Sequence, residues 1–346
     1  MAATEAAVLV ELGRPLEIAE LDLPALTAGQ ALVDIAFSGV CHTQVLEARG
    51  RRGNDPFLPH CLGHEAAGTV AMVAQDVTRV KPGDAVVLSW IKAAGANVPG
   101  TVYDWKGRGV NAGAVTTFQR RAIVSENRLS PIVQGVSMRD AVMLGCALPT
   151  GMGAVVNTAD ARPGESAVIF GAGGVGLCAI AGAACAGCMP VVAVDPNPLK
   201  RELAIQLGAS HTIDPSAGDV GAQIRAIIGA DADFAIEATG RPDVMATALA
   251  VVRAQGGRAV VVGNAPTGAS LTIDPKLLNQ GKRLLGCWGG DVVVDRDLPR
   301  FGRLIAGGRI DLSPLLTRSY SLNDVNVALD DLEAGKVGRP LIDMTL

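Results

Sequence analysis

Hydrophobic and polar positions follow one pattern up to about residue 130 and another beyond about residue 150. In the first part, short apolar runs predict strands at residues 6–10, 31–35, 70–73 and 85–88. Turns rich in glycine and proline, such as Lys81-Pro-Gly-Asp84, separate these runs. The pattern indicates a strand-rich, irregular domain.

The second part alternates short apolar runs with helical spacing. Buried strands are predicted at residues 167–170, 191–195, 234–238, 258–263 and 283–286, with helices at 198–207 and 244–252. This alternation predicts an α/β fold with a doubly wound parallel sheet that helices cover on both faces. Further helices are predicted at residues 138–147, 298–305 and 322–333, and a last strand at 341–344.

A glycine-rich turn lies between the strand at residues 167–170 and a helix of small residues. Its glycines Gly171, Gly173 and Gly176 match the G-x-G-x-x-G spacing in the strand–turn–helix context of a dinucleotide site. Glycines there allow the backbone to approach a pyrophosphate, and the helix that follows offers its N–H groups and positive dipole end. The sequence therefore predicts a dinucleotide-binding domain.

Asp195 ends the strand that follows this turn. An acidic residue at the end of the strand that follows a glycine-rich turn accepts hydrogen bonds from the ribose hydroxyls of NAD and repels the 2′-phosphate of NADP. We therefore expect NAD as the cofactor, although Lys200 and Arg201 close by would soften the preference. The alternative, that Asp195 caps the helix beginning at residues 196–198, stays open.

The length and composition set limits on the class of protein. With 346 residues the chain is long enough for two domains, and 49% hydrophobic residues, 18% charged residues and a net charge of −4 describe a globular protein. We expect no nucleic-acid partner, since there is no basic patch. We also expect no membrane-spanning segment. Without a signal-like N-terminus we expect a cytoplasmic protein. Seven cysteines, an odd number, favour free thiols and metal ligands over a disulfide framework.

Cys41, His64 and Cys146 have the chemistry of a catalytic zinc site. Two thiolates and an imidazole leave the fourth tetrahedral position open, whereas structural zinc sites use all four positions. Taken singly, a buried cysteine is usually a small hydrophobic residue, and a histidine beside glycine is usually structural. Spacing alone leaves both interpretations open.

Five motifs in order carry a family resemblance. They are Gly39-Val-Cys41-His42-Thr43, Gly63-His64-Glu65-Ala-Ala-Gly68, Lys81-Pro-Gly-Asp84, Gly145-Cys146-Ala-Leu-Pro-Thr150-Gly151 and Gly171-Ala-Gly-Gly-Val-Gly176. The chain resembles the zinc-dependent alcohol dehydrogenases of the medium-chain dehydrogenase/reductase superfamily, and most closely their class III branch, the glutathione-dependent formaldehyde dehydrogenases. The resemblance implies a GroES-like catalytic domain at residues 1–147 and 288–346, with a Rossmann NAD-binding domain at residues 148–287 inserted in it.

The resemblance also implies roles for single residues. Cys41, His64 and Cys146 would be the zinc ligands. Thr43 would take the substrate's proton, and Glu65 would be a carboxylate near the metal. The implied cofactor-binding residues are His42, Thr150, Gly171, Gly173, Gly174, Val175, Gly176, Asp195, Lys200, Val262 and Arg339.

The activity that this implies is the NAD-dependent interconversion of an alcohol and its aldehyde or ketone, with hydride leaving a zinc-bound alkoxide. Two alternatives stay open: a related NAD(P)H-dependent reductase of a conjugated carbonyl or iminium, and a non-catalytic NAD-binding protein. The substrate is a small molecule that the sequence does not identify, and glutathione dependence does not follow from the resemblance. We expect a homodimer formed through an edge strand of the Rossmann sheet, or a tetramer.

The chain departs from its resemblance in two places. Relatives in this branch usually carry a second, structural zinc on four cysteines, but residues 89–115 contain no cysteine. We therefore expect one catalytic zinc per subunit and no structural zinc. Gln44 stands where relatives often have Asp, and Leu46 where some have the His that ends the proton path. The proton route beyond Thr43 is left open.

Overall fold

The structure is a computed structural model that describes residues 2–346. The chain divides into two compact units, which we call unit 1 (residues 2–146, 293–308 and 316–346) and unit 2 (residues 147–292 and 309–315). Residues 288–292 and 309–315, together with Ala147, thus lie in unit 2, whereas the sequence prediction assigned them to the catalytic domain. Gly290 explains the first difference, because a Cβ on it would collide with the carbonyl of Pro149 and lie 2.9 Å from Gly153 Cα.

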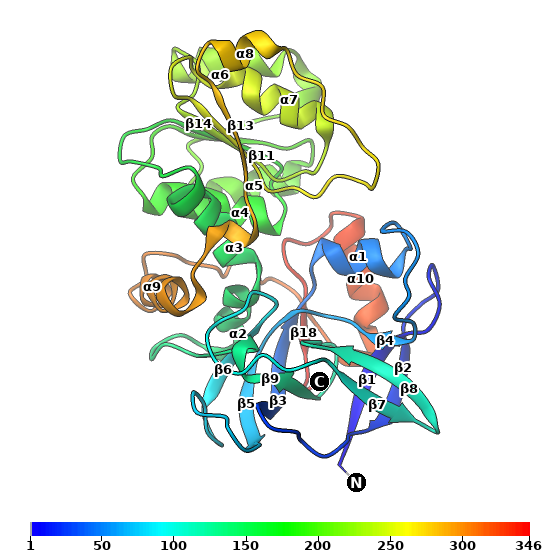
Figure 1. Ribbon diagram of the computed structural model, residues 1–346. Helices are drawn as coiled ribbons and strands as arrows, with labels where there is room; N and C mark the ends of the chain where they lie inside the picture. The colour runs from blue at the N-terminus through cyan, green and yellow to red at the C-terminus, as the bar shows by residue number, and fades with distance from the viewer. Residues whose placement is uncertain (1) are drawn as a thin grey trace. The chain divides into compact units, whose positions relative to one another are not determined.

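Unit 1 contains a closed barrel (Figure 1). Its strands follow the order β1 (Ala3–Leu9), β2 (Glu17–Asp22), β7 (Thr101–Trp105), β8 (Arg108–Gly113) and β4 (His60–Cys61). Buried side chains such as Val8, Leu21 and Tyr103 form its core. The hydroxyl of Tyr103 accepts a hydrogen bond from the Ile123 backbone nitrogen at 2.9 Å, which gives this buried phenol a polar partner.

A larger sheet in unit 1 carries the chain toward the candidate site. Its order is β10 (Leu129–Pro131), β6 (Ala85–Ser89), β5 (Glu65–Val73), β3 (Gln30–Gly39), β18 (Leu341–Asp343) and β17 (Ser319–Tyr320), and β9 (Arg121–Ser125) also pairs with β3. Strand β3 pairs antiparallel with both β5 and β18. The C-terminal strand therefore lies beside the segment that leads to Cys41.

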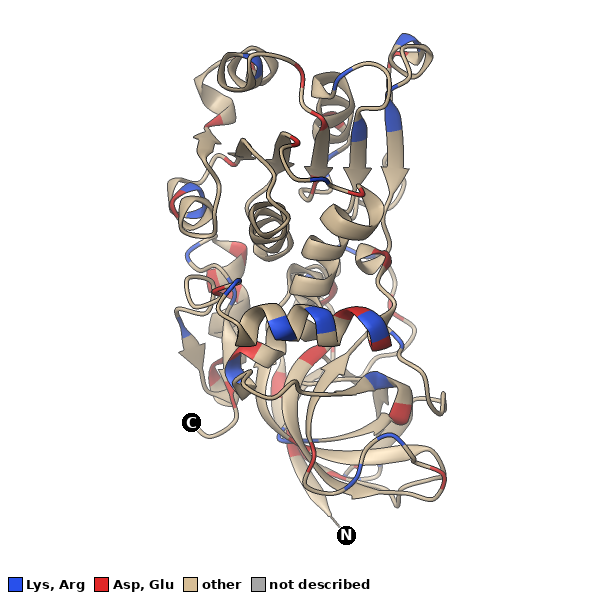
Figure 2. Ribbon diagram, turned by 90° about the vertical axis from the view of Figure 1, so that its left-hand side faces the viewer, with Lys and Arg blue, Asp and Glu red and all other residues tan. Residues whose placement is uncertain are grey.

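Unit 1 has four α-helices among the described residues. They are α1 (His42–Ala48), α2 (Met138–Ala141), α9 (Val294–Ala306) and α10 (Val325–Glu333). Buried Leu298 and Phe301 anchor α9, and Figure 2 shows basic and acidic residues interspersed along this helix. The helix predicted at residues 298–305 is longer in the structure, where α9 covers Val294–Ala306. The helix predicted at residues 322–333 begins with a 3₁₀ turn at Leu322–Asp324.

A loop at residues 90–100 lies in the region where no cysteine is available. The side chain of Glu126 accepts hydrogen bonds from the backbone nitrogens of Thr78 (2.6 Å), Arg79 (2.8 Å) and Ala96 (2.7 Å). Asp295 on α9 accepts a fourth, from Ala94 at 2.8 Å. Two carboxylates thus accept hydrogen bonds from backbone N–H groups of this loop and of the neighbouring segment at residues 78–79.

Unit 2 is built on a fully parallel sheet. Its order is β13 (His211–Ile213), β12 (Val191–Val194), β11 (Ala167–Phe170), β14 (Phe234–Glu237), β15 (Arg258–Val261) and β16 (Arg283–Gly286). Read along the chain, this is the 3-2-1-4-5-6 order of the Rossmann fold. The strands β11, β12 and β14 are buried along their whole length, as the continuous apolar runs predict.

The helices of unit 2 are α3 (Ala147–Gly153), α4 (Gly174–Cys185), α5 (Pro198–Gln206), α6 (Val220–Ile228), α7 (Pro242–Val251) and α8 (Pro275–Asn279). The α/β fold with a Rossmann sheet and a strand-rich second part is therefore confirmed. Within residues 2–346, no single helix is both long and apolar enough to cross a membrane.

Candidate functional site

Cys41 lies where strand β3 gives way to helix α1. It is the N-cap residue of α1, with extended backbone angles (φ −99°, ψ 152°). Two residues earlier, a Cβ on Gly39 would collide with the carboxylate of Glu65. A glycine is therefore required there, because it lets β3 pass close to the buried carboxylate before the chain turns into α1.

His64 immediately precedes strand β5, and the positive φ of Gly63 (86°) sets the turn that places it. The two nitrogens of its ring have different neighbours. Nδ1 lies 2.6 Å from Nε2 of Gln44, and Nε2 lies 3.2 Å from Sγ of Cys146. The ring is thus held on one edge while its other nitrogen points toward a sulfur.

Cys146 interrupts what the sequence predicts as one helix at residues 138–147. That prediction is wrong in detail: α2 ends at Ala141, a 3₁₀ turn covers Val142–Gly145, and α3 starts at Ala147. Cys146 itself has non-helical angles (φ −153°, ψ −67°). Gly145 packs closely at this point, because a Cβ on it would lie 2.6 Å from the carbonyl oxygen of Leu88, and its own carbonyl accepts a hydrogen bond from the Ser89 hydroxyl at 2.7 Å. The irregular backbone places the Cys146 sulfur beside His64.

These three side chains form one group. The sulfurs of Cys41 and Cys146 and a ring nitrogen of His64 lie within 4.8 Å of one another. Both thiols are buried. The adjacent Cys146 thiol holds the pKa of Cys41 well below its usual range, while the hydrogen bond with Cys41 and burial raise the pKa of Cys146. Two sulfurs and an imidazole nitrogen are a donor set that suits zinc and leaves a fourth position open.

Glu65, the first residue of β5, forms a buried ion pair with Arg339, which precedes β18. The two side chains are 0% and 3% exposed. Burial raises the pKa of Glu65 against the opposing charge of Arg339. The charges of Glu65, Cys41 and Cys146 raise the pKa of Arg339 although burial works against it. The structure therefore brings both residues to the sulfur group.

Two other predicted residues lie on α1 beside Cys41. Thr43 places its hydroxyl oxygen 3.8 Å from the sulfur of Cys41. His42, the first residue of α1, is exposed. The arginines that follow α1 are engaged in ion pairs: Arg49 and Arg51 contact Glu333 on α10, at 3.0 and 2.6 Å. That loop is therefore tied to α10.

The glycine-rich turn in unit 2 has the form that the sequence predicts. Gly171 follows β11 with a φ of 87°. A Cβ on Gly176 would collide with the carbonyl oxygen of Gly171. Helix α4 begins at Gly174, and its N-cap Gly173 has no side chain and open space around its Cα. Half-buried Val175 lies in the first turn of α4. The turn thus leaves a helix N-terminus uncapped by a side chain, which suits a phosphate.

Asp195 follows β12 and is only 5% exposed. Its Oδ2 accepts a hydrogen bond from the backbone nitrogen of Ala172 at 2.7 Å, and its Oδ1 accepts one from Asn197 at 2.8 Å. The first bond ties Asp195 to the glycine turn. Helix α5 is instead capped by Asn197, whose side chain accepts from Leu199. The N-cap of α5 is therefore Asn197, and the alternative role of Asp195 as the cap of this helix is wrong.

Three further predicted residues lie on other elements of unit 2. Thr150 lies on α3, and its buried hydroxyl has no hydrogen-bond partner among the described residues. Helix α3 packs directly on α4, since a Cβ on Gly151 would lie 2.7 Å from the backbone nitrogen of Ala179. Val262 follows β15 and donates its N–H to Glu237 at 2.9 Å, and half-buried Lys200 lies on α5.

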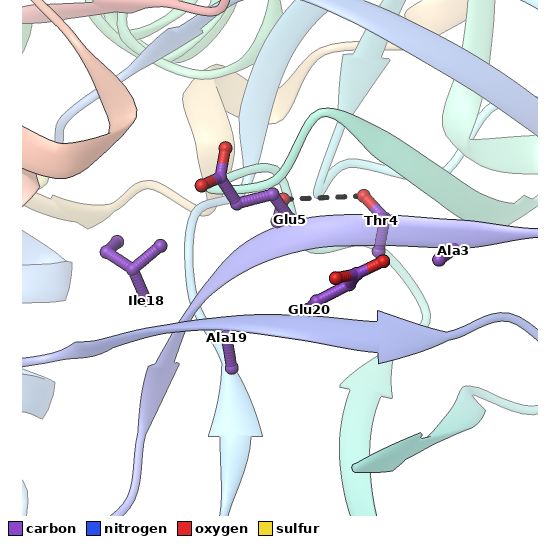
Figure 3. Close-up of a pocket in the computed structure, with 6 residues that line it drawn as sticks. All are labelled: Ala3, Thr4, Glu5, Ile18, Ala19 and Glu20. Atoms are coloured by element: carbon purple, nitrogen blue, oxygen red, sulfur yellow. Dashed lines mark hydrogen bonds between the residues drawn. The ribbon is translucent and has the colours of Figure 1, made fainter. Parts of the chain in front are cut away.

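A surface hollow of about 300 Å³ lies elsewhere in unit 1 (Figure 3). Residues of β1 and β2 line it, among them Thr4 and the carboxylates of Glu5 and Glu20. Glu5 is engaged by Arg120 at 2.8 Å. Since no predicted site residue lines this hollow, it does not bear on the chemistry.

Two residues that the sequence reasoning gave no positive role contribute to the site. Gln44 contacts both Cys41 and His64, and its position three residues after the N-cap Cys41 is the signal of a capping box. Arg201 donates to the backbone carbonyls of Asp195 (2.7 Å) and Pro196 (2.8 Å) and lies 3.1 Å from Asp214. The capping-box spacing is a local signal for Gln44, whereas no spacing pattern predicts the contacts of Arg201.

Comparison with known proteins agrees with this geometry. Residues 27–134 match the alcohol dehydrogenase GroES-like domain, and residues 174–307 match the zinc-binding dehydrogenases. An S-(hydroxymethyl)glutathione dehydrogenase of Synechocystis sp. is 34% identical, over 98% of this chain and 99% of its own length. A putative alcohol dehydrogenase D of Mycobacterium tuberculosis is also 34% identical, with the same coverage. The crystal structure of benzyl alcohol dehydrogenase from Acinetobacter calcoaceticus superposes with a TM-score of 0.89 at 29% identity, over 99% of both chains.

An oxidoreductase with a GroES-like part and a Rossmann part is thus the class that fold and comparisons define. The chain belongs to the zinc-dependent alcohol dehydrogenases of the medium-chain dehydrogenase/reductase superfamily, on their class III-like side. Its activity is zinc-dependent alcohol oxidoreduction, as the resemblance predicts.

Proposed function

We propose that this enzyme uses NAD to interconvert a small alcohol and its aldehyde or ketone, at one zinc ion held by Cys41, His64 and Cys146. The observation that carries the proposal is the group of three ligand atoms within 4.8 Å of one another. Two sulfurs and one nitrogen fit zinc and leave one position for a substrate oxygen. When bound, zinc supplies a Lewis acid that polarises this oxygen and favours its deprotonation.

Thr43 is the residue that we assign to the substrate's proton. Its hydroxyl can accept a proton and donate its own, and it lies on the helix that Cys41 caps, 3.8 Å from that sulfur. Glu65 and Arg339 act behind the ligands. Arg339 supplies a positive charge beside the two sulfurs, where an isolated buried thiolate would be costly, and the ion pair with Glu65 holds it there.

The glycine turn of unit 2 supports NAD as the cofactor. The uncapped N-terminus of α4 would hold the pyrophosphate, and the unpartnered hydroxyl of Thr150 offers a hydrogen bond to a ligand. We keep His42, Val175, Lys200, Val262 and Arg339 as further proposed cofactor contacts. When bound, NAD would supply the acceptor for a hydride from the alcohol carbon.

The choice of NAD over NADP follows from the charges around the ribose position. Asp195 places a carboxylate there, and Arg201 is engaged by two carbonyls and Asp214. No cation is thus free on Arg201 to neutralise a 2′-phosphate, and Asp195 would repel one.

Assembly and location are also part of the proposal. Strand β16 is at the edge of the Rossmann sheet, so a second copy can extend the sheet there, which supports a homodimer or a tetramer built from dimers. None of the seven cysteines forms a disulfide, in keeping with a reducing cytoplasm.

The test is a panel of small, branched, aromatic and anionic alcohols with NAD, run on the wild type, Cys41→Ser, His64→Ala and the control Cys185→Ser. We expect the first two variants to lose zinc and nearly all turnover while they still bind NADH. Cys185, outside the ligand group, should behave as wild type. Activity in metal-free protein would refute the mechanism. Turnover of labelled NADH only with conjugated carbonyls or iminium compounds would favour a reductase. NAD binding without any turnover would favour a non-catalytic protein.

A further inference from the structure

Gln44 lies on α1 and contacts two of the three proposed zinc ligands. Its side chain is buried, and its residue is 1% exposed. The amide oxygen Oε1 accepts a hydrogen bond from the backbone nitrogen of Cys41 at 2.9 Å. The amide nitrogen Nε2 lies 2.6 Å from Nδ1 of His64. One side-chain amide thus joins the backbone of one ligand to the ring of another.

The helix cap fixes which end of the amide faces the ring. Gln44 occupies the third position of α1, where a Gln or Glu side chain returns to the N-cap backbone N–H. Only oxygen can accept from the N–H of Cys41, so Oε1 is committed to the cap. The –NH₂ end therefore faces His64, and as a donor it requires a lone pair on Nδ1. In the neutral ring, the proton is then on Nε2.

A metal ion needs the opposite arrangement of the ring. Nε2 is the nitrogen that points to Cys146, at 3.2 Å from its sulfur, so it is the atom that offers its lone pair to the metal. The ring proton must then move to Nδ1, where it meets the –NH₂ group of Gln44. To accept that proton, the amide must turn over, and its –NH₂ group would then face the N–H of Cys41. Either orientation leaves two donors opposed.

We propose that Gln44 is a positioning residue that weakens zinc binding, so that the zinc of this enzyme is exchangeable. The inference rests on the proposed zinc site at Cys41, His64 and Cys146. A carboxylate at position 44 would remove the conflict, because one oxygen accepts from Cys41 and the other from Nδ1–H of His64. Changing a group that hydrogen-bonds to a metal-binding histidine typically changes metal affinity by about 10- to 100-fold.

The test uses Gln44→Glu, which keeps the size and the helix cap and makes both ends acceptors. The zinc dissociation constant is measured by competition with a chromophoric chelator, and the zinc release rate by transfer to excess chelator. Leu46→Glu, which adds a carboxylate to the same helix at a half-buried position, controls for charge alone. We expect Gln44→Glu to bind zinc at least about tenfold more tightly and to release it more slowly.

A second readout is independent of affinity. In zinc-free protein above the titration of the ring, ¹⁵N shifts of His64 should place the proton on Nε2 in wild type and on Nδ1 in Gln44→Glu. Equal or weaker zinc binding by Gln44→Glu, an equal gain in Leu46→Glu, or Nδ1–H in the wild type would overturn the inference. Zinc binding that survives Cys41→Ser unchanged would instead overturn the proposed site itself.

Discussion

The carboxylate of Glu126 accepts a hydrogen bond from the backbone nitrogen of Ala96 at 2.7 Å. The same side chain accepts from Thr78 and Arg79, so one residue that is 1% exposed closes two loops of unit 1. This is the region in which the resemblance places a structural zinc on cysteines, and residues 89–115 contain none. The carboxylate therefore organises the loop by hydrogen bonds to its backbone.

Glu126→Gln should destabilise the protein by about 1–3 kcal/mol. Its amide can still accept from Thr78 and Arg79, but its –NH₂ group would then oppose the N–H of Ala96 and leave a buried donor without a partner. Urea unfolding at neutral pH measures the effect. Glu20→Gln, at an exposed position of β2, is the matched control and should change stability by less than about 0.5 kcal/mol. An equal effect of both substitutions would contradict this role.

Glu126 also predicts how stability depends on pH. Hydrogen bonds from backbone N–H groups hold the pKa of Glu126 below its usual value, although burial alone would raise it. Because the folded pKa is depressed, the stabilisation is present above the unfolded pKa of about 4.3 and is lost as the pH falls through the folded pKa. The stability difference between wild type and Glu126→Gln should therefore shrink in acid. A constant difference from neutral to acidic pH would show that the charge is not involved.

Asp195→Ala should lower kcat/KM for NAD by about 10- to 100-fold, because a charged hydrogen-bond acceptor is lost. The same variant should gain in relative preference for NADP, since the repulsion of a 2′-phosphate is removed. Steady-state kinetics with both cofactors measures the change, and Asp160→Ala, exposed and outside the glycine turn, is the control. A wild-type enzyme that prefers NADP would contradict the assignment of Asp195.

Thr43→Val should lower kcat by about 10²- to 10⁴-fold, the usual range for a lost proton-transfer group. Thr43→Ser keeps a hydroxyl and should retain most of the activity. Zinc content and NADH binding should stay at the wild-type level in both variants, since Thr43 is not proposed as a ligand. If Thr43→Val works at the wild-type rate, another group accepts the proton.

The sequence predicts those parts of the fold that depend on local periodicity. The buried strand β11 and the turn at Gly171 are recognisable because a continuous apolar run enters a glycine spacing with a known geometric purpose. The helix at residues 138–147 has correct apolar spacing, yet it breaks before Cys146. Just before the break, Gly145 contacts Leu88 and Ser89, which are far away in the sequence. Tertiary contacts of this kind leave no local pattern.

The candidate site divides in the same way. Cys41, His64 and Cys146 are recognisable as residue types with metal-binding chemistry, and the structure brings them together. The ion pair behind them is not recognisable, although the resemblance assigns a role to each of its residues. Glu65 and Arg339 are 274 positions apart and meet because β18 pairs with β3, a long-range pairing that periodicity cannot predict.

Metal content is the most direct test of the central claim that a single zinc at Cys41, His64 and Cys146 supports alcohol oxidation. Wild-type protein and Cys41→Ser are dialysed against metal-free buffer, and zinc per chain and NAD reduction are measured on the same samples. Since Gln44 is expected to make the zinc exchangeable, both are measured again after one equivalent of zinc is added. We predict one zinc per chain in the wild type after addition, activity proportional to it, and neither in Cys41→Ser. Two tightly bound zinc ions per chain, or activity that does not follow the zinc content, would contradict the account.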